Sequence, residues 1–249
     1  MSSPVYKEAD VFARSSALLG DDALKKLRSS VAMVFGLGGV GGHCAESLLR
    51  AGLKKLYIVD KDSVAPSNIN RQILAKYSNI GISKAEIAKL RFESISPFTE
   101  IVAINAFYLP ENPVVIPEDV DIVLDCIDTV SAKIHIMQTC AMQSKALISS
   151  MGMGNRFDPS AISFAKLDKT TCDPLARVLR KLARERNIKN INVVYSKEIA
   201  KNINLSDSSK KATPASLPFV PSTAGILMAY HACDALINDI SLLIPLIHK

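Results

Sequence analysis

Paired cysteines are absent from this 249-residue sequence. Its five cysteines are an odd number and include no C-x-x-C pair. This usage argues against a disulfide framework and against a structural zinc site. A reducing, cytoplasmic compartment fits it best.

Targeting and membrane segments are also missing. The amino-terminal region contains Glu8 and Asp10 and has no apolar stretch, unlike a signal peptide. The most apolar segment, 224–247, is interrupted by His231, Asp234 and Asp239, so we expect no membrane span. No internal repeat is evident. The length suits one domain, or one domain with an insertion.

Acidic residues are fewer than basic ones, and the formal net charge is +6. This balance favours an anionic partner, although many basic enzymes bind only nucleotides. Asp173 and Pro174 predict a helix start, followed by an apolar face. That face comprises Leu175, Val178, Leu179 and Leu182. A basic stripe accompanies it: Arg177, Arg180, Lys181 and Arg184. Such a stripe is usually a solvated face, and nucleic-acid contact is the alternative.

The segment 31–60 organises the chain. An apolar run at 31–35 predicts a buried parallel strand, and Gly36, Gly38 and Gly41 follow with the spacing of a dinucleotide fingerprint. The predicted helix 42–50 would direct its first N–H groups at phosphate. The next strand, 56–59, ends at Asp60, whose carboxylate can bond a ribose. This order suits NAD, FAD or ATP.

Polar residues after Asp60 favour a triphosphate. Asn68, Arg71 and Gln72 bring amide and guanidinium donors to the carboxyl edge of a parallel strand. Ser83 and Glu86 predict a capping box. Lys84 then lies in the first helical turn, where its charge opposes the helix dipole and would suit a phosphate.

Asp125 and Asp128 follow another predicted strand, 122–124. Two carboxylates at a strand end suggest Mg²⁺, although Asp128 or Thr129 could instead cap the helix 131–144. Together, Asp60, Arg71, Lys84 and Asp128 resemble a triphosphate site with a metal, which favours ATP over NAD.

The remaining elements complete an α/β fold. We expect a Rossmann-like, mostly parallel sheet with helices on both faces and a C-terminal α+β extension. Further strands are predicted at 100–106, 146–150 and 192–195, with 162–167 leading away from the core. A broken helical pattern occupies 15–27. Ser222 or Thr223 would cap a final helix. We treat 1–155 as the ATP-binding core and 156–249 as a substrate-facing extension with a mobile loop at 196–217, a candidate substrate gate.

Five ordered motifs resemble the ubiquitin-activating-type adenylating superfamily, which activates carboxylates with ATP. They are GLGGVG at 36–41, Asp60 with Asp62, SNINRQ at 67–72, Lys84, and DCIDT at 125–129. The resemblance implies that Asp60 binds ribose, that Asn68, Arg71 and Lys84 bind the triphosphate, and that Asp128 binds Mg²⁺. The implied nucleotide-binding set is Gly36, Gly38, Gly39, Gly41, Asp60, Asp62, Asn68, Arg71, Gln72, Lys84, Asp128 and Thr129. The implied catalytic set is Arg14, Arg71, Lys84 and Asp128. Arg14 matches an arginine that crosses a homodimer into the partner's ATP site.

Motifs beyond residue 150 are similar to those of tRNA threonylcarbamoyladenosine dehydratases. They are DPLARVLR at 173–180, VVYSKE at 193–198 and FVPSTAG at 219–225. Such enzymes adenylate the threonyl carboxylate of a modified adenosine beside the anticodon, and loss of AMP drives ring closure. The resemblance implies ATP, Mg²⁺ and tRNA as ligands, with a sulfur-relay protein as a further candidate partner. His43-Cys44 departs from the family at the start of the phosphate-facing helix.

Three alternatives remain. A sulfur-carrier activator shares the ATP motifs, but many such proteins carry the C-x-x-C pairs that this chain lacks. An NAD-dependent oxidoreductase is disfavoured by the Arg71–Lys84 cluster, and a non-catalytic scaffold by the full polar set. Cys172 precedes a helix, where a thiol can be reactive. We nevertheless expect Cys172→Ser to retain cyclisation activity, and complete loss with intact ATP binding would contradict this.

Overall fold

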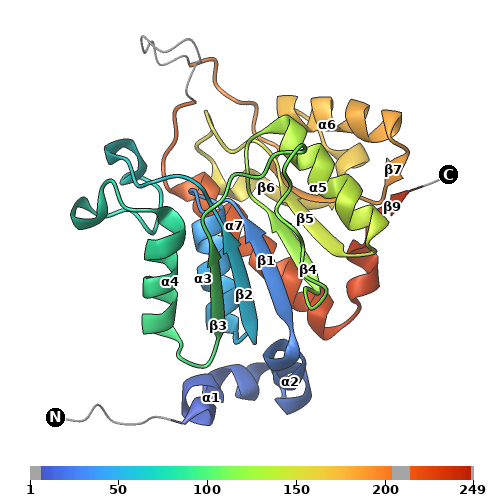
Figure 1. Cartoon of the computed structure of the whole chain (residues 1–249). Coiled ribbons are helices and arrows are strands. Elements are labelled where there is room, and N and C mark those ends of the chain that lie inside the picture. Colours follow the sequence, from blue (N-terminus) through green and yellow to red (C-terminus); the bar gives the residue numbers. More distant parts are fainter. Residues whose placement is uncertain (1–6, 204–213, 248–249) are drawn as a thin grey trace.

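The chain folds around one seven-stranded sheet with the order β3-β2-β1-β4-β5-β8-β6 (Figure 1). This computed structural model describes residues 7–203 and 214–247. The strands are β1 Val31–Phe35, β2 Lys55–Val59, β3 Glu100–Ile104, β4 Ile122–Asp125, β5 Ala146–Ser150, β6 Ile162–Lys166 and β8 Asn192–Ser196. All neighbouring strands pair in parallel except β6, which runs antiparallel to β8. The predicted α/β class and mostly parallel sheet are confirmed.

The helices cover both faces of the sheet because successive side chains of the strands point to opposite sides. In β1, Ala32 and Val34 pack with α3 Gly41–Ala51, α4 Lys84–Ile95 and α7 Phe219–Ile237. Met33 and Phe35 pack with α5 Val130–Met142 and α6 Pro174–Glu185 on the other side. Residues of β1, β4 and β5 are buried throughout, which explains their continuous apolar character.

The chain reverses its direction of travel across the sheet at β1, which pairs with β2 on one side and β4 on the other. In an open α/β sheet, ligands bind outside the carboxyl ends of the strands at such a switch point. The fold therefore places the glycine segment that follows β1 at the expected ligand site.

Three local expectations differ from the structure. The pattern at 15–27 belongs to two helices, α1 Glu8–Leu19 and α2 Asp21–Ser29, separated by Gly20 at φ 84°. Strand β6 does not lead away from the core but forms the sheet edge beside β8. Helix α7 begins at Phe219, so Ser222 and Thr223 lie inside its first turns rather than at its cap.

Helix α1 lies at the amino ends of the strands, because α2 leads directly into β1 (Figure 1). Phe12 of α1 packs beside Gly52, the residue that ends α3, and Glu8 pairs with Arg28 of α2. Arg14, also on α1, consequently lies on the side of the fold opposite the carboxyl ends of the strands.

The C-terminal part completes the fold with a two-stranded sheet of β7 Ile188–Lys189 and β9 Leu246–Ile247. The mobile loop predicted at 196–217 begins at the last residue of β8, and its central residues 204–213 lie outside the described part of the chain. No helix in the described ranges is both long and apolar enough to cross a bilayer.

Candidate active site

A cavity of about 610 Å³ opens at the carboxyl ends of β1, β2 and β4. Eleven of the predicted nucleotide-binding residues line it: Gly36, Gly38, Gly39, Asp60, Asp62, Asn68, Arg71, Gln72, Lys84, Asp128 and Thr129. These residues come from segments almost 100 positions apart in the sequence. The polar set that favoured a nucleotide therefore gathers in one place.

Gly41 belongs to the glycine fingerprint but does not line the cavity. A Cβ atom on Gly41 would lie 1.7 Å from the Gly36 carbonyl oxygen. Gly36 itself adopts φ +85°, a left-handed conformation that favours glycine. Gly41 thus lets α3 pack against the turn after β1, while Gly38, with nothing nearer than 3.9 Å to such a Cβ, borders the open space.

Asp60 is fixed at the end of β2 by two backbone donors. Its Oδ2 accepts from the Leu37 N–H at 2.6 Å, and its Oδ1 accepts from the Asp62 N–H at 2.7 Å. The Asp60 carboxylate therefore links the glycine turn after β1 to the polar loop after β2. Each of its oxygens retains a further lone pair for a ligand hydroxyl.

Lys84 is the first residue of α4 and is almost fully buried. Its Nζ donates to Asp62 Oδ2 at 3.1 Å. Ser83 occupies the predicted cap position, but its side chain makes no capping bond and its Oγ has no hydrogen-bond partner. The predicted capping box with Glu86 is therefore wrong, and the ammonium–carboxylate pair accounts for a lysine at this helix start.

Arg71 lies on the loop after β2, where its Nη1 donates to the Ser67 carbonyl at 2.8 Å and to Asn70 Oδ1 at 3.0 Å. The same loop is closed by Asn68, whose Oδ1 accepts from the Ala65 N–H at 3.1 Å. The polar loop thus orients its own guanidinium at the cavity wall.

Asp125 is not a metal candidate, contrary to the expectation of paired carboxylates. It is fully buried, and its Oδ2 accepts from Lys133 Nζ at 2.8 Å and from Ser149 Oγ at 2.6 Å. Asp128, three residues later, is exposed and lines the cavity. Thr129 is the N-cap residue of α5 without a side-chain capping bond. The two aspartates therefore have different tasks, one inside the core and one at the cavity.

We expect Lys133→Met to destabilise the protein by about 3–5 kcal/mol, because it leaves the Asp125 carboxylate buried without a cation. Urea unfolding measures this change. Lys181→Met is the matched control, since Lys181 is 80% exposed and its pair with Glu185 spans 4.0 Å. An exposed pair contributes at most about 1 kcal/mol. Equal stability of the two variants would contradict the structural role of Lys133.

Several residues that line the cavity were not predicted from the sequence. Lys61 and Phe107 line the wall, with the ammonium 3.5 Å from the ring centroid, and Tyr108 lies beside them. On another side the wall is formed by Met153, Gly154, Pro214, Ser216 and Pro221. The glycine pair Gly152 and Gly154 is the sequence feature that could have indicated this part of the wall. The contact between Lys61 and Phe107 joins residues 46 positions apart and has no local signature.

The residue His43 does not alter the phosphate-facing end of α3. Its Nε2 lies 3.0 Å from Ser222 Oγ on α7, and it is absent from the cavity wall. Burial lowers the pKa of His43, which favours the neutral ring. Close packing of the two helices requires Gly225, because a Cβ there would lie 2.3 Å from the Val40 carbonyl oxygen.

Three of the four side chains in the basic stripe of α6 are exposed to solvent. Arg177, Lys181 and Arg184 are exposed, whereas Arg180 is half-buried and donates to the Thr170 carbonyl at 2.8 Å. The predicted apolar face is wrong at Val178, which is exposed, and it includes Ala176 and Ala183 instead. None of the four basic residues lines the cavity.

The cysteines divide by exposure. Burial raises the pKa of the Cys233 thiol to about 12 and raises the pKa of the Cys140 thiol further. Cys126 is half-buried, packs against the core and lines the cavity. Cys172 is exposed before α6 and adopts φ 57°. Within the described ranges, no three His, Cys, Asp or Glu side chains form a group that could hold a metal ion.

The doubly wound sheet, the glycine turn and the polar loop define a nucleotide-binding protein of the Rossmann-like α/β class. Comparison with known proteins is more specific: the chain belongs to the ThiF family, whose model matches residues 12–243.

One of the named relatives matches almost the whole chain. The tRNA threonylcarbamoyladenosine dehydratase of Bacillus subtilis is 37% identical over 93% of this chain and 96% of its own length. The Escherichia coli dehydratase is 34% identical over 68% of this chain and 63% of its own length. A crystal structure of E. coli tRNA N6-threonylcarbamoyladenosine dehydratase, TcdA, in complex with ATP matches with a TM-score of 0.84. Its sequence identity is 28%, and the match covers 94% of this chain and 97% of that one.

Proposed function

We propose that this protein is an ATP-dependent tRNA threonylcarbamoyladenosine dehydratase. The observation that carries the proposal is the end-to-end similarity to the B. subtilis enzyme, at 37% identity over 96% of its length. Likeness to the ATP-bound and AMP-bound structures of the E. coli enzyme supports a nucleotide in the cavity. The expected nucleotide-binding residues lining that cavity support the same ligand.

Asp60 would bond the ribose, and Asn68, Arg71 and Lys84 would hold the triphosphate. Lys84, whose Nζ pairs with Asp62 at 3.1 Å, would exchange that bond for one to a phosphate oxygen. Arg71 offers a planar donor fork that matches phosphate geometry. The N-terminus of α3 would add its backbone N–H groups.

Mg²⁺ is usually held by one or two carboxylates together with substrate phosphates, and the exposed carboxylate of Asp128 fits this pattern. When bound, Mg²⁺ neutralises phosphate charge. Asp128 would therefore carry the protein's share of the metal site, since Asp125 is committed to Lys133.

The reaction needs an activated acyl group rather than a protein nucleophile. A threonyl carboxylate oxygen attacks the α-phosphorus of ATP, and the bond to pyrophosphate breaks. The ureido group of the same nucleoside then attacks the acyl carbon, loses a proton, and AMP leaves. The nucleoside loses one water overall. The cavity residues would bring the reactants together and stabilise phosphate charge.

Arg14 would act in the partner's site of a homodimer, because it lies on the far side of its own subunit. We expect Arg14→Ala and Arg71→Ala to be inactive alone. Mixed at equal amounts with subunit exchange, they should regain roughly a quarter of wild-type activity, since half the dimers contain one intact site. The matched control mixes Arg71→Ala with Lys84→Ala. Both residues belong to the cavity of their own chain, so this mixture contains no intact site and should stay inactive. No recovery in the first mixture would contradict the crossing of Arg14.

The exposed residues of the basic stripe, Arg177, Lys181 and Arg184, would contact tRNA phosphates.

Release of AMP and pyrophosphate tests the function as a whole. It is measured with tRNA that carries threonylcarbamoyladenosine and with the same tRNA unmodified. We expect release only with the modified tRNA. Pyrophosphate exchange stimulated instead by a small protein with a Gly-Gly terminus would favour sulfur-carrier activation. Stimulation of turnover by an added sulfur-relay protein would identify that further partner.

A further inference from the structure

Two exposed phenylalanine rings contact each other. Phe157 follows β5 and is 56% exposed, while Phe219 begins α7 and is 52% exposed. Their ring centroids lie 6.2 Å apart with an interplanar angle of 87°. In this edge-to-face arrangement each ring supports the other, and about half of the surface of each residue stays exposed.

Both rings are close in sequence to the cavity wall. Phe157 lies three residues after Gly154, and Phe219 lies two residues before Pro221, and both of these neighbours line the cavity. A Cβ atom on Gly154 would be 2.5 Å from Pro214 Cβ, so the wall is tightly packed there. We call Phe157 and Phe219 the aromatic pair.

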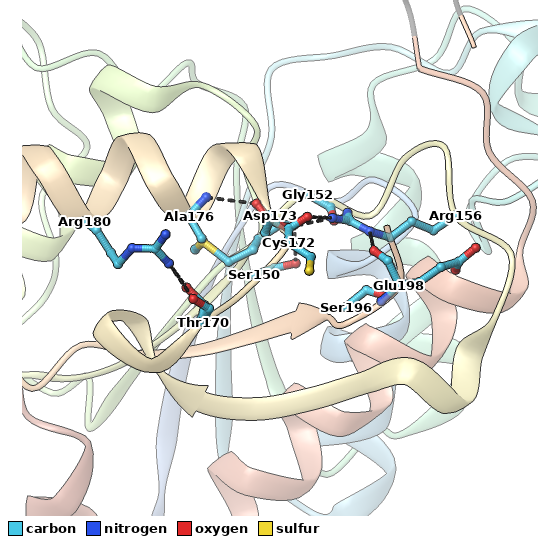
Figure 2. A network of polar contacts seen from close by, with 11 residues as sticks. Ser150, Gly152, Arg156, Thr170, Cys172, Asp173, Ala176, Arg180, Ser196 and Glu198 are labelled. Atoms are coloured by element: carbon cyan, nitrogen blue, oxygen red, sulfur yellow. Dashed lines mark hydrogen bonds and ion pairs between the residues drawn. The ribbon is translucent and has the colours of Figure 1, made fainter. Parts of the chain in front are cut away.

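Buried polar contacts fix the segment that carries Phe157 (Figure 2). Arg156 is almost fully buried, and its Nη2 pairs with Asp173 Oδ2 at 3.2 Å. Its Nε donates to the Glu198 carbonyl at 3.0 Å, and its Nη1 donates to the Gly152 carbonyl. The Glu198 carboxylate accepts the Phe157 N–H at 2.8 Å. The backbone of Phe157 is therefore held in place before any ligand arrives.

Two lysines and two carboxylates accompany the aromatic pair. Lys201 Nζ lies 5.9 Å from the centroid of Phe157, and Lys197 is exposed on the same segment. The carboxylate of Glu198 faces backbone N–H groups, and that of Asp158 accepts from Ser160. Exposed aromatic faces with adjacent lysines suit single-stranded nucleic acid, whose bases stack and whose phosphates are anionic.

We propose that the aromatic pair stacks with unpaired nucleobases of the RNA loop whose modified nucleoside enters the cavity, and that Lys201 contacts its backbone. The inference rests on the proposed function, because it takes RNA to be the substrate. The short distance in sequence from each ring to the cavity wall would place these bases next to the reacting nucleoside. Arg156 and Glu198 act as positioning residues for this surface.

Binding of a fluorescent anticodon stem-loop RNA tests the proposal. We expect Phe157→Leu and Phe219→Leu each to weaken RNA binding by about tenfold, since leucine keeps the apolar character and removes the stacking face. Tyr230→Leu is the matched control, because Tyr230 is 59% exposed on the same helix as Phe219 but eleven residues away. The affinity for ATP should not change in any of these variants. Photo-crosslinking from 5-bromouridine in the loop should label the peptide that contains Phe157 or Phe219.

The outcomes separate this inference from the proposed function. Unchanged RNA affinity in both phenylalanine variants, with an active wild type, would overturn the aromatic pair alone. A wild type that binds RNA but never dehydrates it would overturn the function and leave the surface standing. If the phenylalanine variants sediment as monomers while the wild type sediments as a dimer, and their RNA affinity is unchanged, the aromatic pair contacts a second copy of the chain. That result would overturn the proposal.

Discussion

Arg71→Ala is expected to abolish ATP-dependent AMP formation without unfolding the protein. Arg71 lines the cavity, and its bonds to the Ser67 carbonyl and Asn70 lie within its own loop, so its loss removes no core contact. A positioned donor to developing phosphate charge contributes about 10²–10³-fold in rate, and we expect a loss of at least that size. Single-turnover AMP release measures it, and thermal unfolding verifies the fold.

Arg71→Lys separates charge from geometry. Lysine keeps the positive charge but lacks the planar donor fork, so we expect activity between those of the alanine variant and the wild type. Wild-type turnover in Arg71→Ala would remove this residue from the site. Equal inactivity of the lysine and alanine variants would show that the fork, rather than the charge, is required.

Gly41→Ala is expected to have the largest effect on stability among single glycine substitutions at the site. The new Cβ would lie 1.7 Å from the Gly36 carbonyl oxygen, a backbone atom that cannot rotate away. Helix α3 would have to separate from the turn after β1. We expect a loss of about 3 kcal/mol or more in the free energy of unfolding, at the upper end of overpacking costs.

Gly38→Ala provides the matched comparison. The nearest atom to its new Cβ would be Gln72 Nε2 at 3.9 Å, an ordinary contact. We expect unfolding within about 1 kcal/mol of the wild type, together with weaker ATP binding, because the methyl group enters the space where phosphate approaches the backbone. Urea unfolding and nucleotide titration of both variants separate the two roles. A stable Gly41→Ala protein would show that the turn and the helix are not in close contact.

The sheet and the edge that holds the site were predictable because their signals are local. The apolar run of β1, the glycine spacing and Asp60 lie within 30 residues. Parallel strands then bring their carboxyl ends together, so Asn68, Arg71, Lys84 and Asp128 gather without further information.

Long-range pairings were not predictable. Asp125 differs from Asp128 only because Lys133 and Ser149 meet it in the core. Arg180 leaves the basic stripe because the Thr170 carbonyl lies within its reach. No helical period or residue type indicates such partners. The strands could therefore be placed correctly while the roles of individual side chains, such as Asp125 and Arg180, were assigned wrongly.

Mass spectrometry of nucleosides measures the proposed dehydration itself. The protein is incubated with ATP, Mg²⁺ and tRNA bearing threonylcarbamoyladenosine, and the digested nucleosides are compared with a sample lacking ATP. We expect an ATP-dependent loss of one water from the modified nucleoside, matched by release of AMP. An unchanged nucleoside in the presence of an intact, ATP-binding protein would contradict the dehydratase function.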